Sequence, residues 1–111
     1  MTDEEYYEFI RPYEDAKQML LTRLDVLNHN LYGEASARPI HNIQCRIKKK
    51  RSIEEKLRRK GKEETVINAK DYLQDIAGVR VICYFVDDIY NLTELLKSQS
   101  DLIVIKERDY I

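Results

Sequence analysis

Apolar residues in the first third of the chain recur at gaps of three and four, the period of one face of an α-helix. From Tyr13 onward these positions are Tyr13, Ala16, Leu20, Leu24, Leu27 and Leu31. Pro12 precedes this stripe, and proline is tolerated near the start of a helix but not inside it. We therefore expect a short helix before Pro12, capped by Thr2 or Asp3, and a longer one from about Tyr13 that Gly33 ends.

The period changes to two between Ile40 and Lys48, after a loop expected at 35–39. Three apolar residues alternate here with three polar ones: Ile43, Cys45 and Ile47 with Gln44, Arg46 and Lys48. Such alternation predicts a half-buried strand whose apolar side chains point inward. Arg46 and Lys48 then lie side by side on the opposite face.

Two helices are expected after this strand. Ser52 and Glu55 have the spacing of a capping box, so Ser52 is expected to open a helix that Gly61 ends. The apolar positions that follow predict another helix from about Val66 to Asp75.

Two apolar segments in the last third of the chain predict strands. Val79 to Phe85 is rich in β-branched and aromatic residues, and because Arg80 is its one charge we expect a central strand covered on both faces. Asp87 or Asp88 is expected to cap a following helix, and Leu102 to Lys106 to form a third strand. The element order predicts an α+β fold in which a mixed β-sheet packs against helices.

The composition fits one small domain, residues 1–111, with a charged surface. Charged residues make up 35% of the chain, above the ~25% typical of soluble domains. No apolar run approaches the ~20 residues that a membrane helix needs. The N-terminus, MTDEEYYEF, is acidic and lacks the basic and apolar parts of a signal peptide. We therefore expect a cytoplasmic protein with no membrane segment.

The cysteines, Cys45 and Cys83, do not form a CxxC pair. Only His29 and His41 could add to a metal site built on them, and the spacing does not fit zinc. We expect both cysteines to be buried, small apolar residues that stay reduced.

The formal net charge of −1 hides a strongly basic segment. Residues 46–62 contain ten lysines and arginines and two glutamates, for a local charge of +8. Such a concentration indicates an anionic partner. Nucleotide phosphate, nucleic acid and an acidic protein are all open at this point.

Ser52 and Lys56 are four residues apart, so they share a face at the start of a helix. A helix N-terminus offers unpaired amides and a positive dipole end, which with a hydroxyl and a lysine make a phosphate cradle. A solvated basic helix explains the same pattern.

Asp75 and Arg80 flank the sequence Ile-Ala-Gly-Val. A charge inside an apolar strand is costly unless it is paired. An acid and an arginine at the mouth of a sheet can bind a metal and a nucleotide, or they can pair with each other.

Taken in order, these residues resemble the ATP-binding half of RelA/SpoT-type (p)ppGpp synthetases. The matching motifs are Arg46-Ile-Lys48-x3-Ser52-Ile-x2-Lys56-Leu and Asp75-Ile-Ala-Gly-Val-Arg80. The resemblance continues through Val81-Ile-Cys-Tyr-Phe, the Asp87-Asp88 helix start and the ending Arg108-Asp109-Tyr110-Ile111. It covers roughly residues 13–111, and several motifs in one order arise by chance far less often than one short motif.

The resemblance implies a role for each candidate residue. The adenine ring of ATP would lie between Arg46 and Arg80, because guanidinium planes stack on aromatic rings. Asp75 would be the catalytic aspartate that binds Mg²⁺. The residues implied at the ATP phosphates are Lys48, Ser52, Lys56 and Arg59. Those implied near the acceptor nucleotide, GTP or GDP, are Lys106 and Arg108.

The resemblance also implies an activity and a fold. Members of the family transfer pyrophosphate from ATP to the 3′-hydroxyl of GTP or GDP, which makes the alarmone (p)ppGpp of the bacterial stringent response. The implied fold is a nucleotidyltransferase-like synthetase domain, present here in part. Because few residues precede the first predicted strand, the chain is similar to the small single-domain alarmone synthetases, which often assemble as homotetramers.

The chain departs from the family pattern at its end. Family members continue past the Asp-Tyr-Ile segment into a glycine–tyrosine loop that stacks on guanine, and then to a glutamate that helps to hold the metal. Neither follows Ile111, and the chain stops soon after a predicted strand, so we expect a shortened synthetase domain. Weak ATP binding and no turnover by this chain alone are the expected result.

Three other interpretations are open. The basic segment and the eight tyrosines suit an RNA-binding module, whose affinity would fall steeply with salt. A shortened synthetase that co-assembles with a full-length relative is a second interpretation, and a piece of a complete enzyme is the third.

Overall fold

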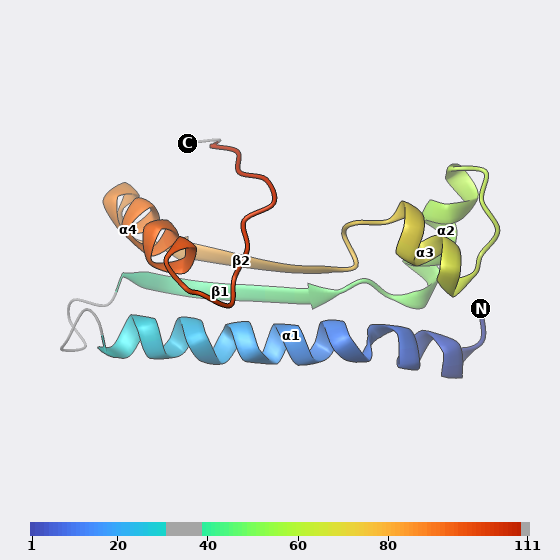
Figure 1. Cartoon of the computed structure of the whole chain (residues 1–111), viewed down its shortest axis with the longest axis horizontal. Coiled ribbons are helices and arrows are strands. Elements are labelled where there is room, and N and C mark those ends of the chain that lie inside the picture. The colour runs from blue at the N-terminus through green and yellow to red at the C-terminus, as the bar shows by residue number, and fades with distance from the viewer. Residues whose placement is uncertain (31–38, 110–111) are drawn as a thin grey trace.

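The computed structural model describes residues 1–30 and 39–109, in which four helices and two strands form an α+β fold (Figure 1). The elements are α1 (Asp3–Asn30), β1 (Ile40–Ile47), α2 (Lys50–Arg59), α3 (Val66–Tyr72), β2 (Ala77–Cys83) and α4 (Val86–Lys97). The predicted helix end at Gly33 and most of the loop at 35–39 lie outside the described residues. The α+β class is confirmed.

The long helix α1 is continuous, and the predicted break at Pro12 is wrong. Its start follows the sequence prediction, because the Thr2 hydroxyl accepts from the Glu5 amide at 3.1 Å and the Glu5 carboxylate accepts from the Thr2 amide at 2.9 Å. Proline removes one backbone hydrogen bond. The helix continues because apolar side chains pack on both sides of Pro12, Phe9 before it and Leu24 after it.

The sheet is an antiparallel pair of strands, β1 and β2. Helices α2 and α3 lie between the two strands in the sequence. The register places Arg46 opposite Gly78 and Gln44 opposite Arg80. The third strand expected at 102–106 is wrong, because these residues run as an irregular segment beside α4 (Figure 1). Ile103 and Ile105 are 87% and 95% exposed, so the apolar side chains that predicted this strand do not pack against the sheet.

One face of the sheet is covered and the other is open. Val79, Val81 and Cys83 on β2 pack in one cluster with residues of α1 and α4. Arg80 and Ile82 point to the opposite face, which no described element covers, and both are exposed. The prediction of a central strand covered on both faces is therefore wrong, since β2 has a partner on only one edge among the described residues.

Several helix ends differ from the predicted ones. Helix α2 begins at Lys50, so Ser52 lies in its first turn and does not cap it, and Glu55 pairs with Arg51 at 3.4 Å. Gly61 ends this helix as predicted, with a φ of +70° that suits glycine. Helix α3 begins at Val66 as predicted but ends at Tyr72, not Asp75, because the following residue is extended.

Helix α4 begins one or two residues earlier than its predicted cap. Phe85 is the capping residue, with no side-chain hydrogen bond. Asp87 and Asp88 instead lie in the first turn, where their charges favour the positive end of the helix dipole.

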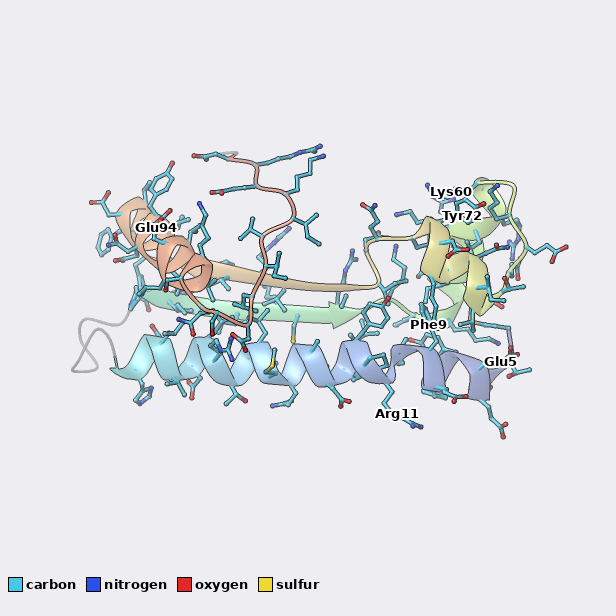
Figure 2. All side chains as sticks on the ribbon, in the orientation of Figure 1. Glu5, Phe9, Arg11, Lys60, Tyr72 and Glu94 are labelled. Carbon is cyan, nitrogen blue, oxygen red and sulfur yellow. The ribbon has the colours of Figure 1, made fainter. Side chains whose placement is uncertain are left out.

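Two apolar clusters hold the elongated molecule together. One joins α2 and α3 to the start of α1, from which Phe9 points toward them (Figure 2). The other joins the second half of α1 to the sheet and α4. Cys45 belongs to neither cluster and is exposed, so the prediction that it is buried is wrong; Cys83 is half-buried, and both cysteines are free.

Across residues 1–30 and 39–109, we find no helix with the length and apolar character needed to cross a membrane.

Pro12 yields a test of the continuous helix. We expect Pro12→Ala to raise the free energy of unfolding by about 1–3 kcal/mol, because alanine restores the missing backbone hydrogen bond and removes the clash of the ring. The measurement is urea unfolding followed by circular dichroism. The matched control is Arg11→Ala, since Arg11 is also exposed on α1 and points away from the sheet (Figure 2). An unchanged or lower stability for Pro12→Ala would mean that α1 is interrupted at this point.

Candidate functional site

Three charged side chains meet where β1 ends, α2 begins and the chain enters β2. The ammonium groups of Lys48 and Lys56 lie 2.7 Å and 2.8 Å from the same carboxylate oxygen of Asp75, Oδ2. Lys48 follows the last residue of β1, Lys56 lies two turns into α2, and Asp75 lies in the turn before β2. Residues distant in sequence thus form one cluster with two positive charges and one negative charge.

The two lysines determine the ionisation of Asp75. Their hydrogen bonds, first from Lys48 and then from Lys56, hold the pKa of the Asp75 carboxyl well below its usual range. The other carboxylate oxygen, Oδ1, is buried and has no hydrogen-bond partner among the described residues. Asp75 therefore stays ionised near neutral pH, and one of its oxygens has no hydrogen-bond partner among the described residues.

This pairing excludes one of the two interpretations of Asp75 and Arg80. The predicted alternative that they pair with each other is wrong, because Asp75 pairs with the two lysines. Arg80 and Arg46 make no ion pair within the part of the chain that the structure describes.

Arg46 and Arg80 project from the open face of the sheet. In an antiparallel pair, directly opposed residues share a face. Gly78, opposite Arg46 and two residues before Arg80, is therefore on this face too. A hollow of about 510 Å³ is lined by Arg46, Gly78, Arg80 and the neighbouring Gln44, Cys45 and Val79. A β-carbon built on Gly78 would meet nothing within 4 Å, so the glycine leaves the floor of the hollow clear.

The start of α2 lies beside the charged cluster. Lys49 precedes the helix in an extended conformation and makes no side-chain capping hydrogen bond. The capping residue therefore offers no side-chain acceptor to the first-turn amides, and the exposed Ser52 lies in the same turn. Unpaired amides, a hydroxyl and nearby lysines favour binding of a phosphate group.

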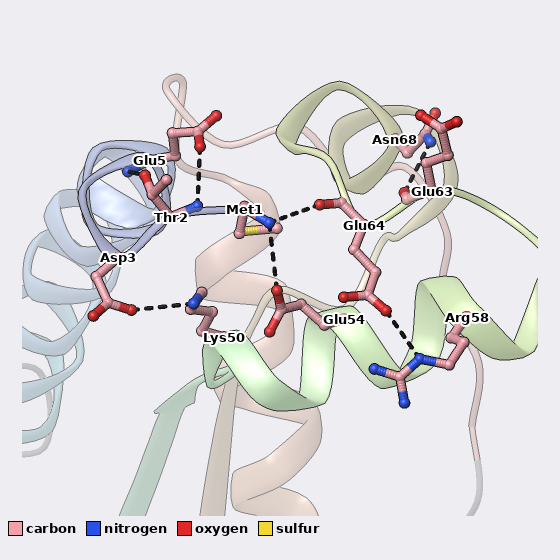
Figure 3. A network of polar contacts seen from close by, with 10 residues as sticks. All are labelled: Met1, Thr2, Asp3, Glu5, Lys50, Glu54, Arg58, Glu63, Glu64 and Asn68. Atoms are coloured by element: carbon pink, nitrogen blue, oxygen red, sulfur yellow. Dashed lines mark hydrogen bonds and ion pairs between the residues drawn. The ribbon is translucent and has the colours of Figure 1, made fainter.

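Charged contacts fasten this end of α2 to the start of α1 (Figure 3). Lys50 pairs with Asp3 at 3.1 Å. The α-amino group of Met1 donates to the Glu64 carbonyl at 2.9 Å and pairs with the Glu54 carboxylate at 3.4 Å. These contacts tie the start of the chain to α2 and to the loop that follows it.

The structure brings together some predicted site residues and separates others. Lys48, Lys56 and Asp75 are in contact, and Arg46 and Arg80 share one hollow. Arg59 is exposed at the far end of α2. Lys106 and Arg108 lie on the segment after α4, away from α2 along the long axis of the molecule (Figure 1).

Sequence reasoning missed the double lysine contact on Asp75 and the part that Gly78 plays opposite Arg46. The alternation of β1 did predict Arg46 on the polar face of this strand, but no sequence signal gives the register that sets Gly78 opposite it.

The residues 45–111 match the model of a family described as a region found in RelA / SpoT proteins. The GTP pyrophosphokinase YwaC of Bacillus subtilis is 39% identical over 99 residues, which are 89% of this chain and 47% of YwaC. The small alarmone synthetase 1 of B. subtilis bound to its product pppGpp has a TM-score of 0.81 and 37% identity, over 98% of this chain and 55% of that one. The same synthetase bound to AMPCPP has a TM-score of 0.78 and 36% identity, over 98% and 57%.

The chain spans about half the length of these relatives. The family match covers more than half of the chain and includes the whole charged cluster and, except for Gln44, every residue that lines the hollow. On these grounds, the chain belongs to the RelA/SpoT family.

Proposed function

We propose that this chain forms the ATP-binding side of a GTP pyrophosphokinase, which transfers pyrophosphate from ATP to the 3′-hydroxyl of GTP or GDP. The names of the relatives support this activity, and the structures with pppGpp and AMPCPP support nucleotide substrates. The observation that carries the proposal is the cluster of Lys48, Lys56 and Asp75 beside an open face with two arginines.

Arg46 and Arg80 are proposed to hold the adenine ring between their guanidinium planes. Arginine suits this role because its planar group stacks on aromatic rings and keeps its charge. The shared face, the hollow between the two residues and the bare Gly78 floor all support it.

The triphosphate is proposed to lie across the start of α2. Lys48 and Lys56 carry two positive charges for it, and the first-turn amides and Ser52 can donate hydrogen bonds. Arg59, at the end of the same helix, is a further candidate. When phosphate oxygens arrive, the lysines can exchange one anionic partner, Asp75, for another.

Asp75 suits a magnesium ligand of the kind that shares the ion with phosphate oxygens. Mg²⁺ is commonly bound by one or two carboxylates together with substrate phosphates. Oδ1 of Asp75 is unpartnered, while the described residues contain no group of three or more metal-ligating side chains. Asp75 would therefore hold Mg²⁺ together with the nucleotide, and the bound ion would neutralise negative charge on the reacting phosphates.

The acceptor side is proposed to be built largely outside these residues. Lys106 and Arg108 are basic and are proposed to contact the acceptor GTP or GDP. The chain matches only about half of its relatives, so we propose that a segment equivalent to their other half completes the acceptor site. A homotetramer in the bacterial cytoplasm is the proposed setting.

RNA is a second candidate ligand, because residues 46–62 carry a local charge of +8. Binding to RNA would weaken steeply with salt and would not depend on Asp75. Binding to ATP and Mg²⁺ would depend on it.

Pyrophosphoryl transfer is the first test. With ATP labelled at the γ-phosphate and Mg²⁺, we expect the 111-residue chain to bind ATP without labelling GTP, and the complete product of its gene to label GTP. Thin-layer chromatography separates the nucleotides, and YwaC is the positive control. Labelled GTP from the chain alone would contradict the proposal that the acceptor side lies largely outside these residues. No labelling by the complete gene product would contradict the proposed pyrophosphokinase activity.

Asp75→Asn tests the charged cluster. The substitution leaves the lysine charges unopposed, and a charge removed at about 4 Å is worth about 1–4 kcal/mol. We expect ATP without Mg²⁺ to bind about tenfold more tightly than to the unsubstituted chain, and Mg²⁺ to give no further gain. Isothermal titration calorimetry measures both affinities.

The matched control for this variant is Asp71→Asn, which removes an exposed carboxylate from α3. Tighter metal-free binding in both variants would indicate a general charge effect. A gain from Mg²⁺ that persists in Asp75→Asn would remove Asp75 from the metal site.

Gly78→Val tests the adenine position. Valine suits a strand, and its β-carbon meets no atom, so the thermal midpoint should be unchanged or higher. The side chain would occupy the floor between Arg46 and Arg80, so we expect ATP affinity to fall by about tenfold. Ile82→Val, farther along the same face, is the control. Normal ATP affinity in Gly78→Val would show that the ring binds elsewhere.

A further inference from the structure

The backbone of Lys48 is held from two sides. Its amide donates to the Ile76 carbonyl at 2.7 Å, next to Asp75. Its carbonyl accepts a hydrogen bond from the hydroxyl of Tyr6 on α1, at 2.8 Å. This second bond joins residues 42 positions apart and is partly buried.

The carbonyl that Tyr6 contacts lies at the junction between β1 and α2. Lys48 is past the end of β1, and the helix begins with the hydrogen bond from the Ile53 amide to the Lys49 carbonyl, at 3.0 Å. The Lys48 carbonyl is therefore used neither by the strand nor by the helix. Because a peptide group is planar, fixing this carbonyl also fixes the Lys49 amide and the direction in which the chain enters α2.

Tyr6 is well placed to hold a fixed position. Its ring packs against the apolar cluster of α1, α2 and α3, and meets the ring of Tyr7 edge to face at 5.3 Å. The contacts of Met1 and Asp3 fasten the same turn of α1 to α2 and the loop after it (Figure 3). Burial, and then the neighbouring Tyr7 and Glu14, raise the pKa of the Tyr6 hydroxyl, so it remains a donor.

We propose that Tyr6 is a positioning residue for phosphate binding, which sets the Lys48–Lys49 peptide and thereby aims Lys48 and the first turn of α2 at the nucleotide phosphates. This inference rests on the proposed function, in which these groups hold the triphosphate. Tyr6 acts through Lys48 and does not contact the nucleotide.

Tyr6→Phe separates positioning from packing. Phenylalanine keeps the ring in the apolar cluster and removes only the hydroxyl. A purely structural role would lower the thermal midpoint and leave the affinity of the folded protein unchanged. A positioning role would weaken the binding of a nucleotide more, the more phosphate groups the nucleotide carries.

The experiment compares the binding of ATP, ADP and adenosine by calorimetry, well below the thermal midpoint of each variant. We expect Tyr6→Phe to bind ATP about fivefold more weakly, the equivalent of one hydrogen bond, and to bind adenosine as the unsubstituted chain does. Tyr7→Phe is the matched control, because Tyr7 is adjacent and 65% exposed. The ¹⁵N–¹H resonance of the Lys49 amide should shift in Tyr6→Phe alone, which confirms loss of the bond.

Lys48→Gln distinguishes the two possible failures. If the unsubstituted chain binds ATP no better than adenosine and Lys48→Gln changes nothing, the proposed function fails and the role of Tyr6 fails with it. If Lys48→Gln weakens ATP binding but Tyr6→Phe matches the unsubstituted chain, the role of Tyr6 alone is overturned. Equal weakening toward ATP and adenosine in Tyr6→Phe overturns it as well.

Discussion

The contact of two lysines with one carboxylate oxygen is the interaction on which the site depends. Asp75 draws together the end of β1, through Lys48, and the second turn of α2, through Lys56. Without the carboxylate, the two ammonium groups would repel each other at close range. Among the described residues, the same arrangement leaves a net positive charge and one oxygen without a hydrogen-bond partner, which supports the proposed phosphate and cation site.

This contact requires a scaffold, and α1 provides it. The helix spans the length of the molecule and contributes to both apolar clusters (Figure 1). Its first turns pack against α2 and α3, while its second half packs against the sheet and α4. Because one element takes part in both clusters, the charged cluster at one end and the sheet that carries Arg46 and Arg80 are held in one frame. The packing of a continuous α1 in both clusters thus stabilises the fold by more than the hydrogen bond that is lost at Pro12 costs.

The two faces of the sheet have different roles. One packs into the core, and the other carries the arginines of the proposed site. Packing of α1 and α4 on Val79 and Val81 leaves Arg46 and Arg80 exposed on the other side. A covered strand could not keep two arginines available without pairing them, since buried unpaired charges are costly. The exposed Ile103 and Ile105 show that part of the apolar pattern in this chain is not satisfied by the described residues.

The sequence alone determined the α+β class, the start of α1 at Thr2 or Asp3, the glycine stop at Gly61, and the motif order that resembles the RelA/SpoT synthetases. These depend on neighbours within a few residues or on local spacing, which a sequence displays directly. The tertiary structure decided the rest: the continuity of α1, the exposure of Cys45, the irregular segment at 102–106 and the partners of Asp75. Each depends on what packs or pairs across long separations, as with Lys48 and Asp75, and no local period or propensity encodes such a contact.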